Sequence, residues 1–201
     1  MKNIVLIGMP GAGKSTIGVI LAKALLYAFT DTDLIIQSKY GMSLSEIIEK
    51  DGTEAFLKIE NDVIAGCEFS NCVIATGGSA VYGEEAMKKL RENGTVVYLK
   101  LPVSELEKRL SNIHTRGVAM KKGETIADLY EKRRPLYEKY ADITVDCYGL
   151  TAEECVEKII SLILCLLLIV STGMISFEVF AAQADESFIK DNMLYVHAVN
   201  D

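Results

Sequence analysis

The stretch Gly8-Met9-Pro10-Gly11-Ala12-Gly13-Lys14-Ser15-Thr16 decides the fold of this chain. It fits the pattern G-x-x-x-x-G-K-[ST], whose backbone N–H groups curl around phosphate oxygens. An apolar run over 4–7 precedes it and predicts a buried strand, and a run over 17–26 with apolar residues on one face predicts a helix. Strand, glycine loop and helix is the context that this motif requires. We therefore expect a nucleotide-binding loop rather than a glycine-rich turn that binds nothing.

The two polar residues at the end of the motif suggest how such a loop would act. Lys14 is long enough to reach the β- and γ-phosphates of a nucleotide, and Ser15 can offer its hydroxyl to Mg²⁺. The helix that begins there also directs the positive end of its dipole at the same anion.

Length and charge narrow the class of protein. The chain has 201 residues, half of them hydrophobic, which suits one α/β domain with a tail. The net charge of −7 argues against a nucleic-acid partner. An acidic protein that binds anions must concentrate positive charge locally, although a solvated helix face explains most of the candidate lysines. The candidates are Lys121, Lys122, Lys132, Arg133 and Arg134.

The cysteines point to a reducing compartment. Their number is odd and no C-x-x-C pair occurs, which argues against a disulfide framework and against a structural zinc site. We expect buried free thiols in the cytoplasm, and a predicted strand at the start of the chain leaves no room for an N-terminal signal peptide. The five are Cys67, Cys72, Cys147, Cys155 and Cys165.

Short apolar runs alternate with helical patterns along the chain. This alternation predicts a three-layer α/β/α fold with a parallel sheet covered on both faces, and an active site at the carboxyl ends of the strands. Ser104 is the expected N-cap of one helix, and Pro135 the expected break in another. Strands are predicted over 2–7, 28–32, 72–75, 95–99 and 143–145, and helices over 15–26, 44–50, 53–67, 84–93, 103–110, 125–140 and from 152 onward.

Two segments outside the phosphate-binding loop suggest chemistry. Asp31 and Asp33 follow the second predicted strand, where one could hold Mg²⁺ through water and the other accept a hydroxyl proton. A helix N-cap is the alternative for either. The stretch over 111–124 lacks a strong apolar period and is either a mobile lid that excludes water or an ordinary surface loop.

Four segments together resemble the shikimate kinase family: Gly8–Thr16, Asp31-Thr32-Asp33, Ala75-Thr76-Gly77-Gly78 and Arg133-Arg134-Pro135-Leu136-Tyr137. Their order and spacing agree from residue 1 to about 160. Adenylate and gluconate kinases share the first segment but not the later ones. The resemblance implies a five-stranded parallel sheet of the nucleoside-monophosphate-kinase type, a monomer, and Mg²⁺- and ATP-dependent phosphorylation of a shikimate hydroxyl in aromatic amino-acid synthesis.

The resemblance also implies roles for particular residues. Asp33 would bind the acceptor hydroxyls and act as the base, Asp31 would hold the metal together with Ser15, and Arg133 would pair with the acceptor carboxylate. Arg116 would be the lid arginine that neutralises the transferred phosphate, and Arg109 would stack on adenine. The ATP phosphates would lie on Gly11, Ala12, Gly13, Lys14, Ser15 and Thr16, and the acceptor would approach Gly77 and Gly78 closely.

The departures from the family pattern gather on the acceptor side. Leu57 stands where the family has a second arginine for the carboxylate, and Ser79 replaces a third glycine. The lid reads Arg116-Gly117-Val118-Ala119, without the usual proline, and Leu26 replaces a glycine after the first helix. Three alternatives stay open: a kinase for another hydroxy-acid or polyol, a non-catalytic ATP-binding relative, and a membrane-tethered regulatory protein.

The tail is the reason for the last alternative. No charged residue occurs between Lys158 and Glu178, and the segment 159–177 is apolar enough for membrane contact, which would leave the kinase domain in the cytoplasm. The same pattern fits an internal signal-like stretch, or an extended final helix that packs on the sheet. We expect a kinase domain over 1–164, and over 165–201 a hydrophobic segment and polar tail of uncertain role.

Overall fold

The computed structural model describes residues 2–110, 118–120 and 123–172. The chain divides into two compact units, Met1–Val156 and Glu157–Asp201. The first unit carries all of the sheet and every residue of the site described below.

Five parallel strands form a single sheet in the first unit, as predicted. The spatial order is β2-β3-β1-β4-β5, and β1 lies in the centre with Ile4 opposite Val73 on one side and Thr95 on the other. Because all strands run the same way, their carboxyl ends meet at one edge. The strands are β1 (Asn3–Ile7), β2 (Ala28–Asp31), β3 (Cys72–Ala75), β4 (Gly94–Lys100) and β5 (Ile143–Asp146).

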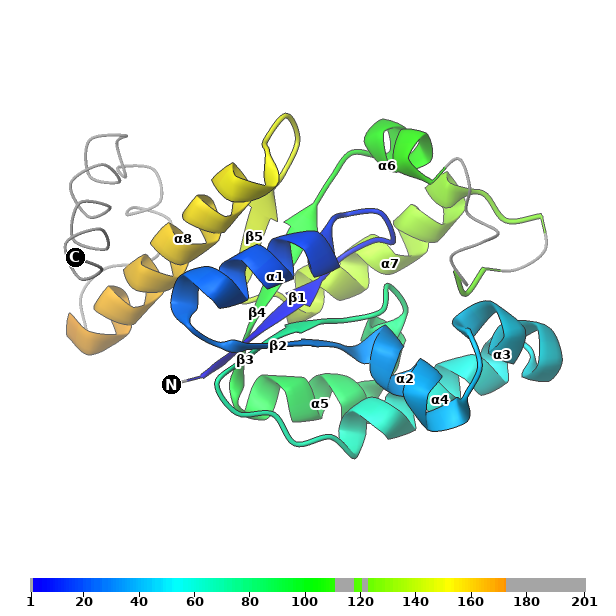
Figure 1. Cartoon of the computed structure of the whole chain (residues 1–201). Helices are drawn as coiled ribbons and strands as arrows, with labels where there is room; N and C mark the ends of the chain where they lie inside the picture. The colour runs from blue at the N-terminus through cyan, green and yellow to red at the C-terminus, as the bar shows by residue number, and fades with distance from the viewer. Residues whose placement is uncertain (1, 111–117, 121–122, 173–201) are drawn as a thin grey trace. The chain divides into compact units, whose positions relative to one another are not determined.

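Helices cover both faces of this sheet, which confirms the three-layer architecture. Figure 1 shows α1 on one face and α5 on the other. The helices of the described residues are α1 (Lys14–Leu25), α2 (Thr32–Tyr40), α3 (Leu44–Asp51), α4 (Thr53–Ala65), α5 (Glu84–Glu92), α6 (Val103–Arg109), α7 (Ile126–Tyr140), α8 (Ala152–Thr172) and the short 3₁₀ helix η1 (Ala80–Tyr82).

The central strands are buried along their whole length. Every residue of β1 and β3 is buried, because a parallel strand covered on both faces has no side left for water. Their continuous apolar runs are what made these two strands easy to predict.

A smaller apolar cluster joins α2, α3 and α4. Ile36, Leu44, Ile47 and Phe56 are buried in it, and the half-buried Leu57 packs against it. The cluster fixes α4 beside the carboxyl edge of the sheet. It also gives Leu57 an apolar environment, which accounts for an apolar residue at that position.

Three local expectations were wrong or incomplete. The helix α2 was not predicted, because its single buried aliphatic position, Ile36, leaves almost no periodic signal. Ser104 does not cap α6, whose N-cap is Pro102 with no side-chain hydrogen bond. Pro135 does not break α7, which is helical on both sides of it. The loss of one backbone hydrogen bond at Pro135 is tolerated because Arg133 and Tyr137 anchor both halves of the helix in the protein interior.

Leu26 ends α1 in an unfavourable conformation. Its φ of 55° lies in the left-handed region, and its side chain is 91% exposed. Glycine is the usual residue at such a position because it has no Cβ to clash.

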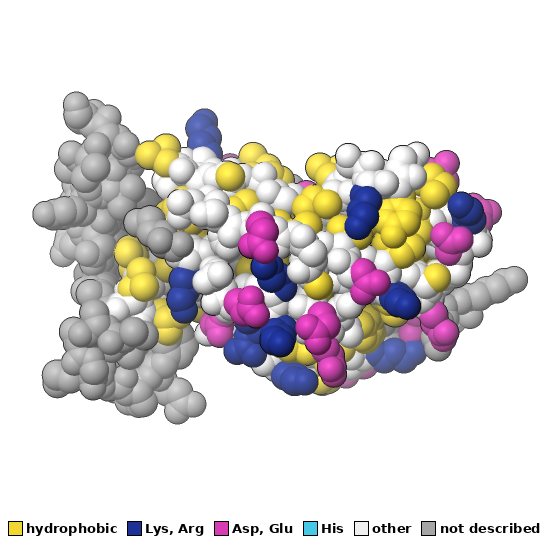
Figure 2. Space-filling view, turned by 90° about the horizontal axis from the view of Figure 1, so that it is seen from below, with side chains coloured by type: hydrophobic (Ala, Val, Ile, Leu, Met, Phe, Trp, Pro, Cys, Tyr) yellow, Lys and Arg dark blue, Asp and Glu magenta, His cyan; other side chains and the backbone are white. Residues whose placement is uncertain are grey.

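The surface charge is mixed. On the face shown in Figure 2, basic and acidic side chains lie among one another. In the described part of the chain, no helix is both long enough and apolar enough to cross a membrane. The predicted hydrophobic segment 159–177 lies partly outside the described residues, as does most of the predicted tail.

Candidate active site

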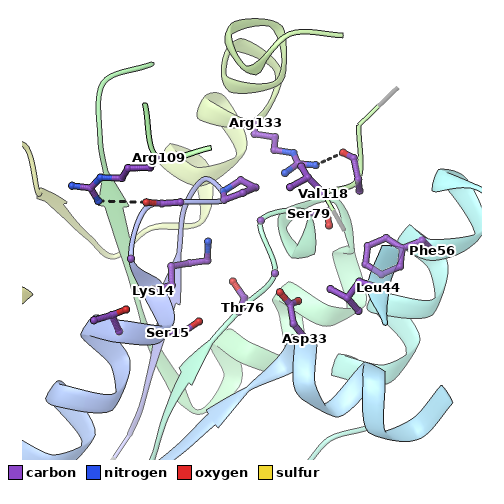
Figure 3. Close-up of a pocket in the computed structure, with 17 residues that line it drawn as sticks. Lys14, Ser15, Asp33, Leu44, Phe56, Thr76, Ser79, Arg109, Val118 and Arg133 are labelled. Carbon is purple, nitrogen blue, oxygen red and sulfur yellow. Dashed lines mark hydrogen bonds between the residues drawn. The ribbon is translucent and has the colours of Figure 1, made fainter. Parts of the chain in front are cut away.

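A cavity of about 530 Å³ opens at the carboxyl edge of the sheet. Figure 3 shows Lys14 at the start of α1, Asp33 from α2 and Arg133 from α7 around this cavity. The loop that follows β3, from Thr76 to Ser79, also lines the cavity. Residues from several separate stretches of sequence therefore meet here, including Phe56 of α4 and Arg109 of α6.

The P-loop, Gly8–Thr16, has the backbone that its glycines permit. Gly11 and Gly13 have φ values of 80° and 92°, which a residue with a Cβ rarely adopts. The amine of Lys14 donates to the carbonyl oxygens of Gly8 (2.7 Å) and Met9 (2.9 Å). These two hydrogen bonds stabilise the conformation of the P-loop. Burial lowers the pKa of Lys14 to about 8. A bound anion would raise this pKa, because a nearby negative charge favours the protonated amine.

Ser15 and Asp31 form a hydrogen-bonded pair beside the loop. The Ser15 hydroxyl donates to Asp31 Oδ2 at 2.6 Å, and the other carboxylate oxygen accepts from the Asp33 N–H at 3.0 Å. Asp31 is thus the N-cap of α2, the alternative foreseen from the sequence, while its outer oxygen faces Ser15. Hydroxyl and carboxylate oxygens are the ligands that Mg²⁺ prefers. Within the described residues no cluster of three or more His, Cys, Asp or Glu could hold a metal ion.

Asp33 contributes a buried carboxylate to the cavity. Its Oδ1 atom is buried without a hydrogen-bond partner among the described residues. Burial, helped by the neighbouring Asp31 charge, raises the pKa of Asp33 to about 6. A Cβ on Gly77 would lie 2.7 Å from this oxygen, so a glycine at position 77 keeps the carboxylate accessible from the β3 loop.

Glu60 is a functional candidate that reading the sequence missed. It is 1% exposed, and a Cβ on Gly77 would also clash with its Oε1. Neither oxygen has a hydrogen bond of normal geometry in the described residues, although the nearby Ser79 hydroxyl still favours the ionised form. Burial nevertheless dominates and raises the pKa of Glu60 to about 7. One sequence signal could have indicated its burial: Glu60 follows Phe56 by four residues and therefore lies on the same buried face of α4.

Arg133 contributes a buried guanidinium to the cavity. It is 1% exposed, its Nη2 donates to the carbonyl oxygen of Ala119 at 2.7 Å, and its guanidinium lies 5.4 Å from the centroid of the Tyr82 ring. Its Nε has no partner among the described residues. A Cβ on Gly78 would lie 2.7 Å from Pro10 Cδ and 3.0 Å from Arg133 Nη1, so the β3 loop packs tightly between the P-loop and this arginine.

Arg109 lies on the opposite side of the P-loop. Its Nη1 is 3.4 Å from the carbonyl oxygen of Gly11. A second cavity of about 170 Å³ begins there, and its walls include Thr16, Cys147 and Cys155. Arg116 lies outside the described residues, as does most of the predicted lid.

The buried acids predict an unusual dependence of stability on pH. A carboxyl group whose pKa is raised by folding binds its proton more tightly in the folded state, so the free energy of unfolding falls as pH rises from about 4.5 to about 7. In the wild type we expect the Glu60 contribution to lower the free energy of unfolding by on the order of 2 kcal/mol between pH 5 and pH 7.5. Glu60→Gln should abolish this difference, measured by urea unfolding at both pH values. The exposed Glu92→Gln is the matched control, and an equal pH dependence in both variants would contradict the assignment to Glu60.

Comparisons with known proteins agree with this geometry. Residues 10–164 match the family model described as shikimate kinase. The shikimate kinase of Thermodesulfovibrio yellowstonii is 42% identical over 163 residues, which cover 80% of this chain and 94% of the relative. That of Caldanaerobacter subterraneus is 40% identical over 80% of this chain and 95% of the relative. The structure of Acinetobacter baumannii shikimate kinase in complex with shikimate superposes with a TM-score of 0.75, at 33% identity, over 82% of this chain and 94% of that one. The chain belongs to the shikimate kinase family.

Proposed function

We propose that this protein transfers the γ-phosphate of ATP to a hydroxyl of shikimate and releases shikimate 3-phosphate. One observation carries the proposal: a single cavity joins the phosphate-binding loop with Lys14 to a buried carboxylate, Asp33, and a buried cation, Arg133. The family and the neighbour that binds shikimate support the same acceptor. The kinase domain would span residues 1–164.

The nucleotide side of the cavity fits ATP. The N–H groups of Gly11, Ala12, Gly13, Lys14, Ser15 and Thr16 and the Lys14 amine would hold the phosphates and stabilise the charge that develops on them. Mg²⁺, held by Ser15 and Asp31 with phosphate oxygens, would neutralise part of that charge. Arg109 borders the second cavity, where the adenine ring would lie, and Arg116 would act from the lid.

The acceptor side fits a hydroxylated carboxylate. The unpartnered Oδ1 of Asp33 would accept the proton of the attacking hydroxyl, because the group is ionised above a pH of about 6. The Arg133 guanidinium would bind the carboxylate, and the backbone at Gly77 and Gly78 would admit the ring closely.

A coupled assay of ADP release with Mg²⁺–ATP, using the full chain, tests the proposal. Rapid turnover that depends on shikimate is the expected result. If turnover is absent with shikimate but present with another small hydroxy-acid or polyol, that molecule is the acceptor and the assignment to shikimate is wrong. The observation that favours testing such acceptors is Leu57, which packs against an apolar cluster where the family pattern has an arginine for the acceptor carboxylate.

Leu57→Arg probes the acceptor directly. Position 57 lies three residues before Glu60 on α4, so a guanidinium there would lie next to an acid and near the cavity. If shikimate is the acceptor, we expect KM for shikimate to fall about tenfold, the effect of one charge-assisted hydrogen bond. Lys58→Arg on the exposed side of α4 is the control. An unchanged or higher KM in Leu57→Arg would count against a carboxylate at this place.

A further inference from the structure

Tyr137 connects three parts of the site that are far apart in the sequence. It is fully buried, and its hydroxyl donates to the carbonyl oxygen of Gly78 at 2.7 Å. The same oxygen lies 3.8 Å from the sulfur of Met9 in the P-loop. Tyr137 also lies one helical turn after Arg133 on α7, so both side chains leave the same face of that helix.

The hydrogen bond to Gly78 determines the orientation of a peptide that borders the cavity. In a trans peptide the carbonyl of one residue and the N–H of the next point in opposite directions. A Gly78 carbonyl held by Tyr137 therefore directs the Ser79 N–H away from α7. Among the described residues no hydrogen bond is donated by the backbone N–H of Gly78 or Ser79, and both residues line the cavity.

Glycine at position 78 makes this restraint necessary. A residue without a side chain has more backbone freedom than any other. Pro10 and Arg133 limit the space around Gly78, but neither forms a hydrogen bond that would orient its peptide. Burial raises the pKa of Tyr137 well above its usual range, against the opposing effect of Arg133, so the hydroxyl stays protonated and remains a donor.

We propose that Tyr137 is a positioning residue for acceptor binding, whose hydroxyl orients the Gly78–Ser79 peptide and so prepares it to hold the acceptor in the cavity. This inference rests on the proposed function, because the acceptor is the molecule that the peptide would bind. It assigns a function to a tyrosine that is not itself among the residues lining the cavity.

Tyr137→Phe tests the inference by removing one hydroxyl and keeping the ring. We expect KM for shikimate to rise about threefold to tenfold, the effect of one neutral hydrogen bond, while kcat and KM for ATP change by less than about twofold. Incorporation of 4-aminophenylalanine at position 137 restores a donor and should restore KM.

Tyr98→Phe is the matched control. The Tyr98 ring stacks on that of Tyr137 with centroids 5.1 Å apart, and its hydroxyl forms no hydrogen bond with Gly78. Loss of a buried hydroxyl from the same aromatic pair should leave KM for shikimate unchanged. An equal rise of KM in both variants would show that Tyr137 acts through packing alone and would overturn the proposal.

A measurement without turnover keeps the inference separate from the proposed function. In the ¹³C NMR spectrum of the free protein, the Gly78 carbonyl should move upfield in Tyr137→Phe and not in Tyr98→Phe, since its hydrogen bond is lost. A wild-type chain that does not phosphorylate shikimate would refute the proposed function, whereas an unmoved Gly78 resonance would refute the positioning role of Tyr137.

Discussion

Lys14→Ala should lower kcat for phosphoryl transfer by about two to three orders of magnitude, the effect of removing one preorganised donor from a transition state. The amine is buried beside the P-loop and within reach of the cavity, where the charge of the transferred phosphoryl group develops. It also donates to the carbonyl oxygens of Gly8 and Met9, so its removal loosens the loop. The measurement is ADP release at saturating shikimate and Mg²⁺–ATP.

Lys23→Ala on the exposed face of α1 is the control for this substitution. It removes a lysine from the same helix without touching the cavity, and kcat should stay at the wild-type value. Circular dichroism and thermal unfolding of Lys14→Ala should show a folded chain, because the sheet does not depend on this side chain. Near-normal turnover in the folded variant would mean that the P-loop is assigned wrongly.

Asp33→Asn should lower kcat by about two to four orders of magnitude, the usual effect of a general base. The amide has the shape of the carboxylate but cannot accept a proton at neutral pH. The wild type should also show kcat/KM rising with pH through a value near 6, because Asp33 must lose its proton to act and its pKa is raised to about 6. That rise should vanish in Asp33→Asn.

Asp51→Asn at the exposed end of α3 is the matched control and should keep both the rate and the pH profile. An acid limb that persists in Asp33→Asn would belong to another group, with Glu60 the nearest candidate by pKa. Wild-type turnover in Asp33→Asn would contradict the assignment of Asp33 as the base.

Most of the fold could be predicted because its signals are local. The P-loop is a continuous stretch whose glycines adopt the backbone that the motif requires. The residues 4–7 of β1 and all of β3 are continuous apolar runs. The helix α2 was missed because a helix with little apolar periodicity resembles a loop in sequence. The path of α7 through Pro135 was missed because a local rule predicted a break, whereas buried residues on both sides hold the helix together.

The candidate site was predictable in its members but not in its environment. Lys14, Asp33, Gly77, Gly78 and Arg133 all line one cavity, as expected from four separate segments. Glu60 was missed because a glutamate in a helix usually faces water, and its burial depends on which side of α4 faces Gly77 in the loop after β3. The surroundings of Leu57 were likewise hidden, since α2 and α3 supply the apolar cluster that it joins.

The sequence by itself determined the parallel sheet, the phosphate-binding loop and the family, because glycine positions and apolar periods are properties of neighbouring residues. Tertiary structure alone decided that Glu60 is buried, that Asp33 has a raised pKa, and that Tyr137 holds the Gly78 carbonyl. These properties arise from desolvation and from contacts between residues distant in the chain. Both depend on how the helices pack around the carboxyl edge of the sheet, which no single stretch of sequence contains.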